Sequence, residues 1–280
     1  MAECYVPVAL GSVPGMQLQD ANVLLTGASG GIGRAIARAL DARGAKVLLS
    51  ARRADVLEEI RAELGGRPGT LPADLADRAA AAELVAQAGE VDVLVANAGL
   101  PASGRAEGFS AEEIDAALDV NLRAPIQLTR LLLPGMLERG RGHLLYVSSL
   151  AGKVASPRGA LYSATKFGLR GYAAGLRQDV EPRGVGVTVV YPGFISDAGM
   201  FADSGAKLPP WVGTRTPQQL AEAVVQAIEQ DRAEVDVAPL SLRAGSLLAS
   251  LAPVTLARVQ RRLGSVGVAD SIAQGQRPES

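Results

Sequence analysis

The chain has 280 residues, of which 48 % are hydrophobic and 20 % are charged, and this balance indicates a folded globular protein rather than a disordered or fibrous one. Its formal net charge is −1 and it contains no dense block of Lys and Arg, which argues against a nucleic-acid-binding protein. The single cysteine, Cys4, and the single histidine, His143, leave no partner for a disulfide or a zinc cluster, and we expect a cytoplasmic protein.

Residues 1–17 are expected to form a loose leader. They include Glu3, Pro7 and Pro14 and lack an early basic cluster, which argues against a secretory signal. No run of 18 apolar residues occurs in the chain, so no membrane-spanning helix is expected. We expect one main domain over residues 18–239 and a helical tail over residues 240–280.

From residue 22 onward, short β-rich runs alternate with longer helical patterns. This alternation is typical of a parallel sheet covered by helices on both faces. The expected strands are residues 22–26, 45–50, 69–73, 91–96, 142–147, 185–191 and 233–238. Seven strands in this order predict a single doubly wound α/β domain.

The segment "TGASGGIG" (26–33) directly follows the first expected strand and opens the first helix. Glycines here permit a tight turn and a close approach of the backbone to a ligand, and the helix N-terminus offers unpaired N–H groups to a pyrophosphate. The segment therefore predicts a dinucleotide site. Its expected contacts are Gly27, Ser29, Gly31, Ile32 and Gly33.

The second expected strand ends in "SARR" (50–53) and supplies no carboxylate for a ribose 2′-hydroxyl. Arg52 and Arg53 could instead hold a 2′-phosphate through charge-assisted hydrogen bonds, which predicts NADP(H) in preference to NAD(H). The alternative is that both arginines are solvated and Asp55 contacts the ribose, although Asp55 fits the first turn of the next helix better.

The stretch 109–133 reads as a helix that begins at a capping box formed by Ser110 and Glu113. Asn121 falls on its apolar face. Pro125 has no N–H, so the carbonyl of Asn121 loses its i+4 partner and we expect a kink there. Asn121 could therefore belong to the site. The alternative is a simple proline kink in which the side-chain amide of Asn121 is hydrogen-bonded inside the protein.

Residues 162–166 read "YSATK", and the i,i+4 spacing places Tyr162 and Lys166 on one helix face. At roughly 4 Å and an effective dielectric constant of about 20, the ammonium would favour the phenolate by about 4 kcal/mol, or roughly 3 pKa units. Tyr162 would then be an acid/base group usable near neutral pH. The alternative is that both side chains merely share an exposed face.

Together with "NAG" (97–99), Ser149 and "PG" (192–193), these motifs closely resemble the short-chain dehydrogenase/reductase family over residues 18 to 238. The serine stands thirteen residues before the tyrosine and the lysine four residues after it. The resemblance implies a doubly wound Rossmann-type fold with a seven-stranded, mostly parallel sheet. It also implies that the main domain binds NADP(H) and interconverts a carbonyl and an alcohol.

By this resemblance Tyr162 is the catalytic acid/base, Ser149 bonds the reacting oxygen, and Lys166 lowers the pKa of the tyrosine and holds the ribose. Ser148 is adjacent, but only Ser149 has the family's spacing. The main-chain carbonyl of Asn121 would hold a water in a proton relay. Further implied cofactor contacts are Asp74 near the adenine, Asn97, Gly99, Pro192 and Gly193.

One position departs from the family pattern. The family usually places after "PG" a threonine that helps to hold the nicotinamide carboxamide, and Asp197 stands at about that position with Ser196 nearby. The nicotinamide contact is therefore open. Apolar residues in the segments that border the substrate pocket of this family favour a lipophilic substrate: Leu150, Val154, Phe194, Met200, Phe201, Leu208 and Trp211.

The segment 240–264 predicts two short amphipathic helices separated at Pro253. They could pack on the protein's own surface or on a neighbouring subunit, contact a membrane surface peripherally, or form a lid for a lipid-like substrate. Residues 270–280 are expected to be mobile. Glycines along the tyrosine helix fit the family's habit of forming homodimers or homotetramers.

Two rival functions remain. The segment "GASGG" (27–31) also fits a serine-hydrolase motif with Ser29 as nucleophile and His143 as base. A non-catalytic NADP(H)-binding sensor or scaffold on the same fold is the second rival. The Asn–Ser–Tyr–Lys set argues against the sensor, because a pure binding module needs no acid/base group.

Overall fold

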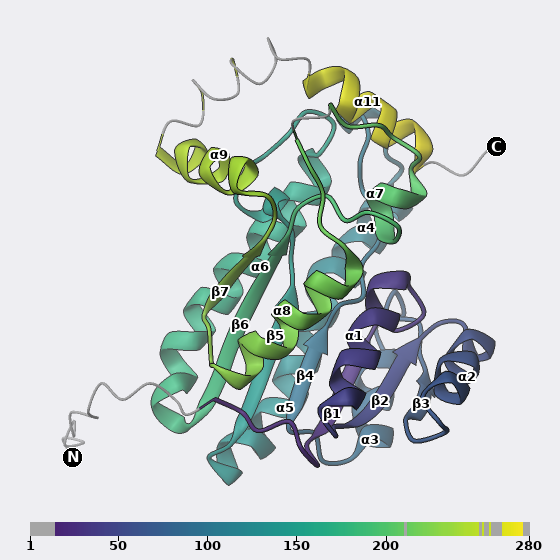
Figure 1. Cartoon of the computed structure of the whole chain (residues 1–280), viewed down its shortest axis with the longest axis vertical. Helices are drawn as coiled ribbons and strands as arrows, with labels where there is room; N and C mark the ends of the chain where they lie inside the picture. The colour runs from purple at the N-terminus through teal and green to yellow at the C-terminus, as the bar shows by residue number, and fades with distance from the viewer. Residues whose placement is uncertain (1–14, 210–211, 252–253, 255–257, 259–264, 277–280) are drawn as a thin grey trace.

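The computed structural model describes residues 15–209, 212–251, 254, 258 and 265–276, and its centre is one seven-stranded sheet (Figure 1). Each strand lies within two residues of its predicted range. The strands are β1 (Asn22–Thr26), β2 (Lys46–Ala51), β3 (Gly69–Pro72), β4 (Val93–Ala96), β5 (Gly142–Val147), β6 (Val185–Pro192) and β7 (Glu234–Val237).

The strand order is β3-β2-β1-β4-β5-β6-β7, and every neighbouring pair is parallel. The chain starts in the middle at β1, moves outward to β3 and then crosses back to continue from β4. The order therefore reverses between β1 and β4. In doubly wound sheets, ligands bind at the carboxyl ends of the strands beside this reversal.

Helices cover both faces of the sheet, as predicted, because successive side chains of each central strand point to opposite faces. Val23 and Leu25 of β1 belong to one buried cluster and Leu24 to the other. The first cluster includes residues of α1 (Gly31–Ala42), α2 (Ala54–Glu63) and α8 (Pro217–Glu229). The second includes residues of α3 (Ala80–Ala88), α5 (Ala124–Arg139) and α6 (Ala160–Val180).

The predicted helix at 109–133 is interrupted. Helix α4 (Ala111–Leu118) begins with the expected capping box of Ser110 and Glu113. A π-helical turn follows at Asp119–Arg123, in which the Ala124 N–H donates to the Asp119 carbonyl, and α5 then begins. Pro125 cannot donate to the Asn121 carbonyl, so the expected kink takes the form of this wider turn. Asn121 is 1 % exposed.

Helices α7 (Gly199–Asp203), α9 (Leu240–Leu251) and α11 (Ser265–Gly275) lie at the carboxyl-end side of the sheet (Figure 1). The shorter turns of the chain are Ala106–Gly108, Leu150–Gly152 and Glu181–Arg183. Residues 270–275, expected to be mobile, instead belong to α11. The reason is that Ala273 is buried and the helix has contacts with α7 and with the loop before α6.

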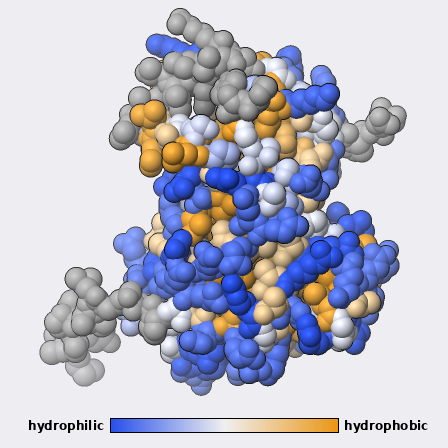
Figure 2. All heavy atoms as spheres, viewed as in Figure 1, coloured by the Kyte–Doolittle hydropathy of each residue, from blue (hydrophilic) through white to orange (hydrophobic). Residues whose placement is uncertain are grey.

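The first helix of the tail exposes apolar side chains. Leu240, Leu247 and Leu248 of α9 are 76 %, 68 % and 59 % exposed, and hydrophobic atoms gather where Figure 1 places this helix (Figure 2). Trp211 and most of the second amphipathic helix expected after Pro253 lie outside the described residues. No helix in the described part of the chain is long and apolar enough to cross a membrane.

Candidate active site

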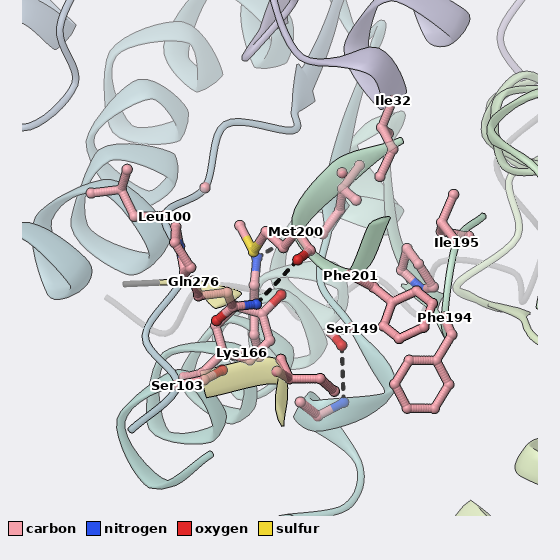
Figure 3. A pocket seen from close by; sticks show the side chains of 18 of the residues that line it. Ile32, Leu100, Ser103, Ser149, Lys166, Phe194, Ile195, Met200, Phe201 and Gln276 are labelled. Carbon is pink, nitrogen blue, oxygen red and sulfur yellow. Dashed lines mark hydrogen bonds between the residues drawn. The ribbon is translucent and has the colours of Figure 1, made fainter. Parts of the chain in front are cut away.

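A cavity of about 980 Å³ opens at the carboxyl ends of the central strands (Figure 3). One end is lined by the glycine loop after β1 and by the residues that follow β2, β3 and β4. The other end is lined by α7, α9 and α11 and by the segment between β5 and α6. The cavity thus joins the predicted dinucleotide site to a second compartment.

The glycine loop has the geometry that its sequence predicts. Gly27 has a φ of +67°, and a Cβ added there would lie 2.7 Å from the Ala98 backbone. A Cβ on Gly33 would lie 2.2 Å from the Gly27 carbonyl oxygen. Helix α1 begins at Gly31 with no acidic residue in its first turn, so its free N–H groups can receive an anion. Ser29, Gly31 and Ile32 also line the cavity.

Asn97 fixes the start of this loop. Its Nδ2 donates to the carbonyl oxygens of Thr26 and Gly27, each at 3.1 Å, while its backbone N–H donates to Thr26 Oγ1 at 3.2 Å. Thr26 is 1 % exposed and also accepts from the Ala98 N–H. The role of Thr26 was not predicted, because only the pairing of β1 with β4 shows which groups donate to its hydroxyl.

The end of β2 presents positive charge to the cavity. Arg52 and Arg53 both line it and both are exposed. Arg53 Nη2 donates to the Ser29 carbonyl at 3.1 Å, whereas Arg52 has no ion pair or hydrogen bond with any described residue. Asp55 lies in the first turn of α2 and does not line the cavity. Asp74 does line it, as predicted.

Ser149, Tyr162 and Lys166 meet at the centre of the cavity. Tyr162 and Lys166 share one face of α6, and Lys166 is 3 % exposed. Ser149 Oγ accepts from the Ala151 N–H at 3.1 Å. The same hydroxyl is near enough to the Tyr162 hydroxyl to lower its pKa. Ser148 instead donates to the Lys166 carbonyl at 3.3 Å. The hydroxyl next to the tyrosine is therefore that of Ser149.

The expected lowering of the tyrosine pKa by the lysine is not found. Burial raises the pKa of Tyr162 to about 12, and the neighbouring Ser149 hydroxyl only partly opposes this rise. Burial also lowers the pKa of Lys166 to about 8. Lys166 Nζ donates to the Val147 carbonyl at 3.1 Å and lies 5.6 Å from the Tyr162 ring centroid, so it faces the ring rather than the phenolic oxygen.

Asn121 stands behind the cavity wall and does not line it. Its Oδ1 accepts from the Leu100 N–H at 2.6 Å, and its Nδ2 donates to the Leu100 carbonyl at 2.9 Å. A Cβ added to Gly99 would lie 3.4 Å from Asn121 Oδ1 and 3.8 Å from Lys166 Nζ. The amide is thus satisfied internally, as the simpler alternative held, and it supports the segment that separates it from the lysine.

The segment after β6 confirms one of two expectations. Pro192 and Gly193 line the cavity as predicted. Asp197 is exposed with a φ of +62° and accepts from Ser196 Oγ at 2.7 Å, and neither residue lines the cavity. Ala198 takes the inward place, since a Cβ on Gly31 would lie 2.5 Å from its methyl group. The structure therefore gives no support to a contact of Asp197 or Ser196 with the carboxamide.

The second compartment is mainly apolar. The rings of Phe194 and Phe201 pack with their centroids 4.9 Å apart. Every described residue that the sequence analysis placed near the substrate lines the cavity: Leu150, Val154, Phe194, Met200, Phe201 and Leu208. The tail helices α9 and α11 contribute further lining, which the sequence analysis considered only as one of several roles for the tail.

The arrangement needed for a serine hydrolase is absent. His143 is 1 % exposed at the start of β5, where Nε2 is bonded to Thr188 Oγ1 at 2.9 Å. Ser29 follows the carboxyl end of β1, whereas His143 lies at the amino end of β5. In a parallel sheet these two residues are therefore on opposite sides, one at each end of the strands. The hydrolase prediction is wrong for this reason. The described residues also contain no cluster of three His, Cys, Asp or Glu that could hold a metal.

Comparison with known proteins agrees with this geometry. The family model described as short chain dehydrogenase matches residues 21–209. "Ketoacyl reductase HetN" of Nostoc sp. is 37 % identical over 263 residues, covering 90 % of this chain and 91 % of the relative. "Dehydrogenase/reductase SDR family member 7B" of Bos taurus is 34 % identical over 257 residues, covering 84 % and 79 %.

Two solved structures show the same fold. A short-chain dehydrogenase from Streptomyces avermitilis superposes with a TM-score of 0.72 at 28 % identity, covering 89 % of this chain and 98 % of its own. The closed form of a serine dehydrogenase complexed with NADP+ superposes with a TM-score of 0.69 at 30 % identity, covering 78 % and 95 %. The matches of sequence, fold and site geometry coincide, and the chain belongs to the short-chain dehydrogenase family.

Proposed function

We propose that this protein is an NADP(H)-dependent oxidoreductase that interconverts a carbonyl and an alcohol on a lipophilic substrate, with Tyr162 as acid/base. The observation that carries the proposal is the position of Ser149, Tyr162 and Lys166. These three residues lie on the wall of one continuous cavity, between a dinucleotide-type glycine loop and an apolar compartment.

The residues at the first end of the cavity fit the cofactor. The N-terminus of α1 would hold the pyrophosphate, Lys166 the ribose, and Asp74, Asn97, Gly99, Pro192 and Gly193 would form further contacts. Arg52 and Arg53, with no carboxylate at the end of β2, would hold a 2′-phosphate. Relatives solved with NADP, such as the serine dehydrogenase, support the same preference. When bound, the cofactor supplies or accepts the hydride.

In the reducing direction, the carbonyl carbon gains the hydride and the oxygen gains a proton from the Tyr162 hydroxyl. Ser149 donates a hydrogen bond to the developing oxyanion. A pKa of about 12 keeps Tyr162 protonated at neutral pH, which is the form that reduction needs. In the reverse direction the phenolate would accept the proton. The Asn121 carbonyl would position a relay water near Lys166, and its side chain positions residues 99 and 100.

The remaining parts of the proposal concern assembly and location. We expect a cytoplasmic homodimer or homotetramer. Gly171 and Gly175 on α6 have open space where a Cβ would point, and Phe167 on the same helix is 41 % exposed. The exposed leucines of α9 are compatible with peripheral contact to a membrane surface through residues 240–264.

Parallel equilibrium titrations with NADPH and NADH, followed through nicotinamide fluorescence, test the proposal first. A screen of NADPH oxidation with medium-chain ketones and aldehydes follows. We expect tight NADPH binding, weaker NADH binding and turnover of some carbonyls. Binding without turnover of any carbonyl or alcohol would favour the sensor, and the absence of binding would overturn both functions.

A further inference from the structure

The serine turn, residues 149–153, connects β5 to the segment before the tyrosine helix α6. Within it, Ser149 Oγ accepts from the Ala151 N–H at 3.1 Å (Figure 3). The Lys153 N–H donates to the Leu150 carbonyl at 2.9 Å. The first three residues of the turn line the cavity, whereas Lys153 does not. Because these bonds link both ends of the turn, a movement of Lys153 would carry the Ser149 hydroxyl with it.

One side of the serine turn packs on the tyrosine helix. Gly152 lies so close to this helix that an added Cβ would be 2.7 Å from the Lys166 carbonyl oxygen and 2.8 Å from Ser148 Oγ. Ser148 Oγ itself donates to the same carbonyl at 3.3 Å. Close packing of this kind limits how far the turn can approach the helix, but it does not stop the turn from moving away. A second restraint is therefore needed on the other side.

Ion pairs with β7 supply this second restraint. Lys153 Nζ lies 2.6 Å from Asp236 Oδ1 and 3.1 Å from Glu234 Oε2. The two acidic residues stand two positions apart on β7, so their side chains point to the same face of the sheet. The Lys153 ammonium also lies 4.0 Å from the ring centroid of Tyr191, which is fully buried in β6. The lysine thus connects the serine turn to the last two strands of the sheet.

The two carboxylates differ in how much they depend on Lys153. The side chains of Lys153 and Asp236 are only 12 % and 15 % exposed, and the lysine is the one ion-pair or hydrogen-bond partner of Asp236 among the described residues. Glu234 is 39 % exposed and also accepts from Arg170 at 3.1 Å and from the Tyr191 hydroxyl at 2.9 Å. Loss of the ammonium would therefore leave Asp236 as an unpaired and mostly buried charge, which is costly.

The serine turn is the part of this cluster that can move when the charge balance changes. Tyr191 and Asp236 are paired in register between β6 and β7, and the hydrogen bonds of the parallel ladder fix their backbone. The turn belongs to no strand. A change in the ion pairs of Lys153 would therefore be relieved by movement of the turn, and with it of Ser149.

We propose that Lys153 is a positioning residue, which holds the serine turn so that the Ser149 hydroxyl stays beside Tyr162 and the reacting oxygen. It acts from outside the cavity, through its ion pair with Asp236, and touches neither substrate nor cofactor. This inference rests on the proposed function, because it explains how one group of that site is kept in place. A misplacement of about 1 Å can cost about 100-fold in rate, even when the residue that causes it is remote from the chemistry.

The first test replaces Lys153 with methionine, which removes the charge and keeps an unbranched side chain of similar length. With a carbonyl that the wild type reduces, kcat should fall by about 10- to 100-fold. The Kd for NADPH should change by less than about twofold, because no cofactor contact is lost. Lys153→Arg retains the cation and should recover most of the lost rate. The matched control is Arg170→Met, which removes the other cation bound to Glu234 without touching the turn and should leave kcat unchanged.

A double-mutant cycle with Ser149 separates positioning from a general loss of stability. Ser149→Ala should lower kcat by about 100- to 1,000-fold, because one donor to the oxyanion is lost. Since Lys153 is proposed to act through Ser149, Lys153→Met should cause no further loss in the Ser149→Ala background. Single-turnover NADPH oxidation at high enzyme concentration measures these slow variants. An effect on stability alone would lower kcat by the same factor with and without Ser149.

Hydrogen exchange supplies a readout that needs no turnover. The backbone N–H groups of residues 149–153 should exchange faster in Lys153→Met and in Asp236→Asn than in the wild type and in Arg170→Met. Asp236→Asn removes the paired charge and leaves the turn unchanged, so it gives the same comparison of kcat should Lys153→Met fail to fold.

Two outcomes would overturn the inference while leaving the oxidoreductase intact: wild-type kcat and exchange in Lys153→Met and Asp236→Asn, or an equal loss of kcat from Lys153→Met with and without Ser149. A wild type that oxidises NADPH with no carbonyl at all would overturn the proposed function, and this inference with it.

Discussion

In the proposed function, two neighbouring arginines at the end of β2 would decide between NADPH and NADH. Arg52 has no partner among the described residues, although it lines the cavity. Arg53 already donates to the Ser29 carbonyl of the glycine loop. By the proposal, Arg52 would bind the 2′-phosphate, and Arg53 would support the glycine loop through its bond to Ser29.

Replacing Arg52 with alanine should weaken NADPH binding by about 10- to 100-fold, because a hydrogen bond to a charged group contributes about 1.5–3 kcal/mol. NADH has no 2′-phosphate, so its affinity should change by less than about threefold. Fluorescence titration of both cofactors measures this difference. Arg130→Ala, an exposed arginine of α5 bonded to Gln127, is the control. Equal losses for the two cofactors would show that Arg52 does not read the phosphate.

The spacing of the motifs predicted which residues lie together, but not the direction in which their pKa values shift. The motifs placed Ser149, Tyr162 and Lys166 together, because a short strand–turn–helix segment fixes their relative positions. The direction of the tyrosine pKa shift was wrong, because it depends on burial and on the turn of Lys166 Nζ toward Val147. These quantities arise from long-range packing, which a single sequence does not display.

At the scale of elements, the seven strands were predictable because short β-rich runs are bounded by clear breaks. The π-helical turn before α5 was predictable only as a break at Pro125, since the proline shows which bond is lost and not which bond replaces it. A helical tail was predicted, but the position of α11 within it was not, because Val268, Ala269, Ile272 and Ala273 form too short an apolar stripe in a polar terminus. The contacts with Arg158 and α7 stabilise it.

Two glycines of α11 provide a matched test of how this helix is held. A Cβ on Gly275 would lie 1.9 Å from the Ser204 carbonyl oxygen, whereas one on Gly267 would meet nothing within 4 Å. Alanine at either position favours the helix itself by about 0.5–1 kcal/mol. We expect Gly267→Ala to leave the melting temperature equal or slightly higher.

Gly275→Ala should instead displace the end of α11 from α7. The expected results are faster proteolysis after residue 250 and a several-fold higher KM for the substrate, with NADPH affinity unchanged. Limited proteolysis and steady-state kinetics on both variants measure these effects. The same protease resistance and KM in Gly275→Ala and Gly267→Ala would contradict the packing described for this helix.

At the scale of the whole molecule, a buried polar cluster joins elements far from the cavity. His143 of β5 is bonded to Thr188 of β6, and its Nδ1 lies 3.8 Å from Asp231 Oδ1 in the turn before β7. Arg177 of α6 pairs with Asp231 at 2.7 Å and donates to the Val187 carbonyl. One helix, two strands and the turn before β7 thus meet at the amino ends of the strands, away from the site.

This cluster predicts a loss of stability in mild acid. Burial lowers the pKa of His143 to about 4, against about 6.5 in an unfolded chain. The unfolded state therefore binds more protons between these values, and the stability of the folded state falls as the pH drops from about 6.5 toward 4. Between pH 7 and pH 5 the histidine alone should cost about 2 kcal/mol.

Urea unfolding of the wild type and of His143→Gln at the two pH values measures this effect. His143 is the single histidine of the chain, so no other imidazole contributes. The variant should have a lower free energy of unfolding than the wild type at pH 7. Between pH 7 and pH 5, however, its free energy of unfolding should fall by about 2 kcal/mol less than that of the wild type. The protonation of carboxylates contributes equally to both proteins. An equal pH dependence in the two proteins would show that His143 is not held neutral by the fold.

The most direct test of the central claim compares Tyr162→Phe with Tyr172→Phe, which changes a second tyrosine of the same helix that packs edge-on against Tyr146. For each variant the Kd for NADPH and the kcat for a carbonyl turned over by the wild type are measured together. Tyr162→Phe should keep the NADPH affinity and lose about 100- to 10,000-fold in kcat, because the proton donor is gone, while Tyr172→Phe should keep both. A kcat unchanged in Tyr162→Phe would contradict the assignment of this tyrosine as the acid/base group.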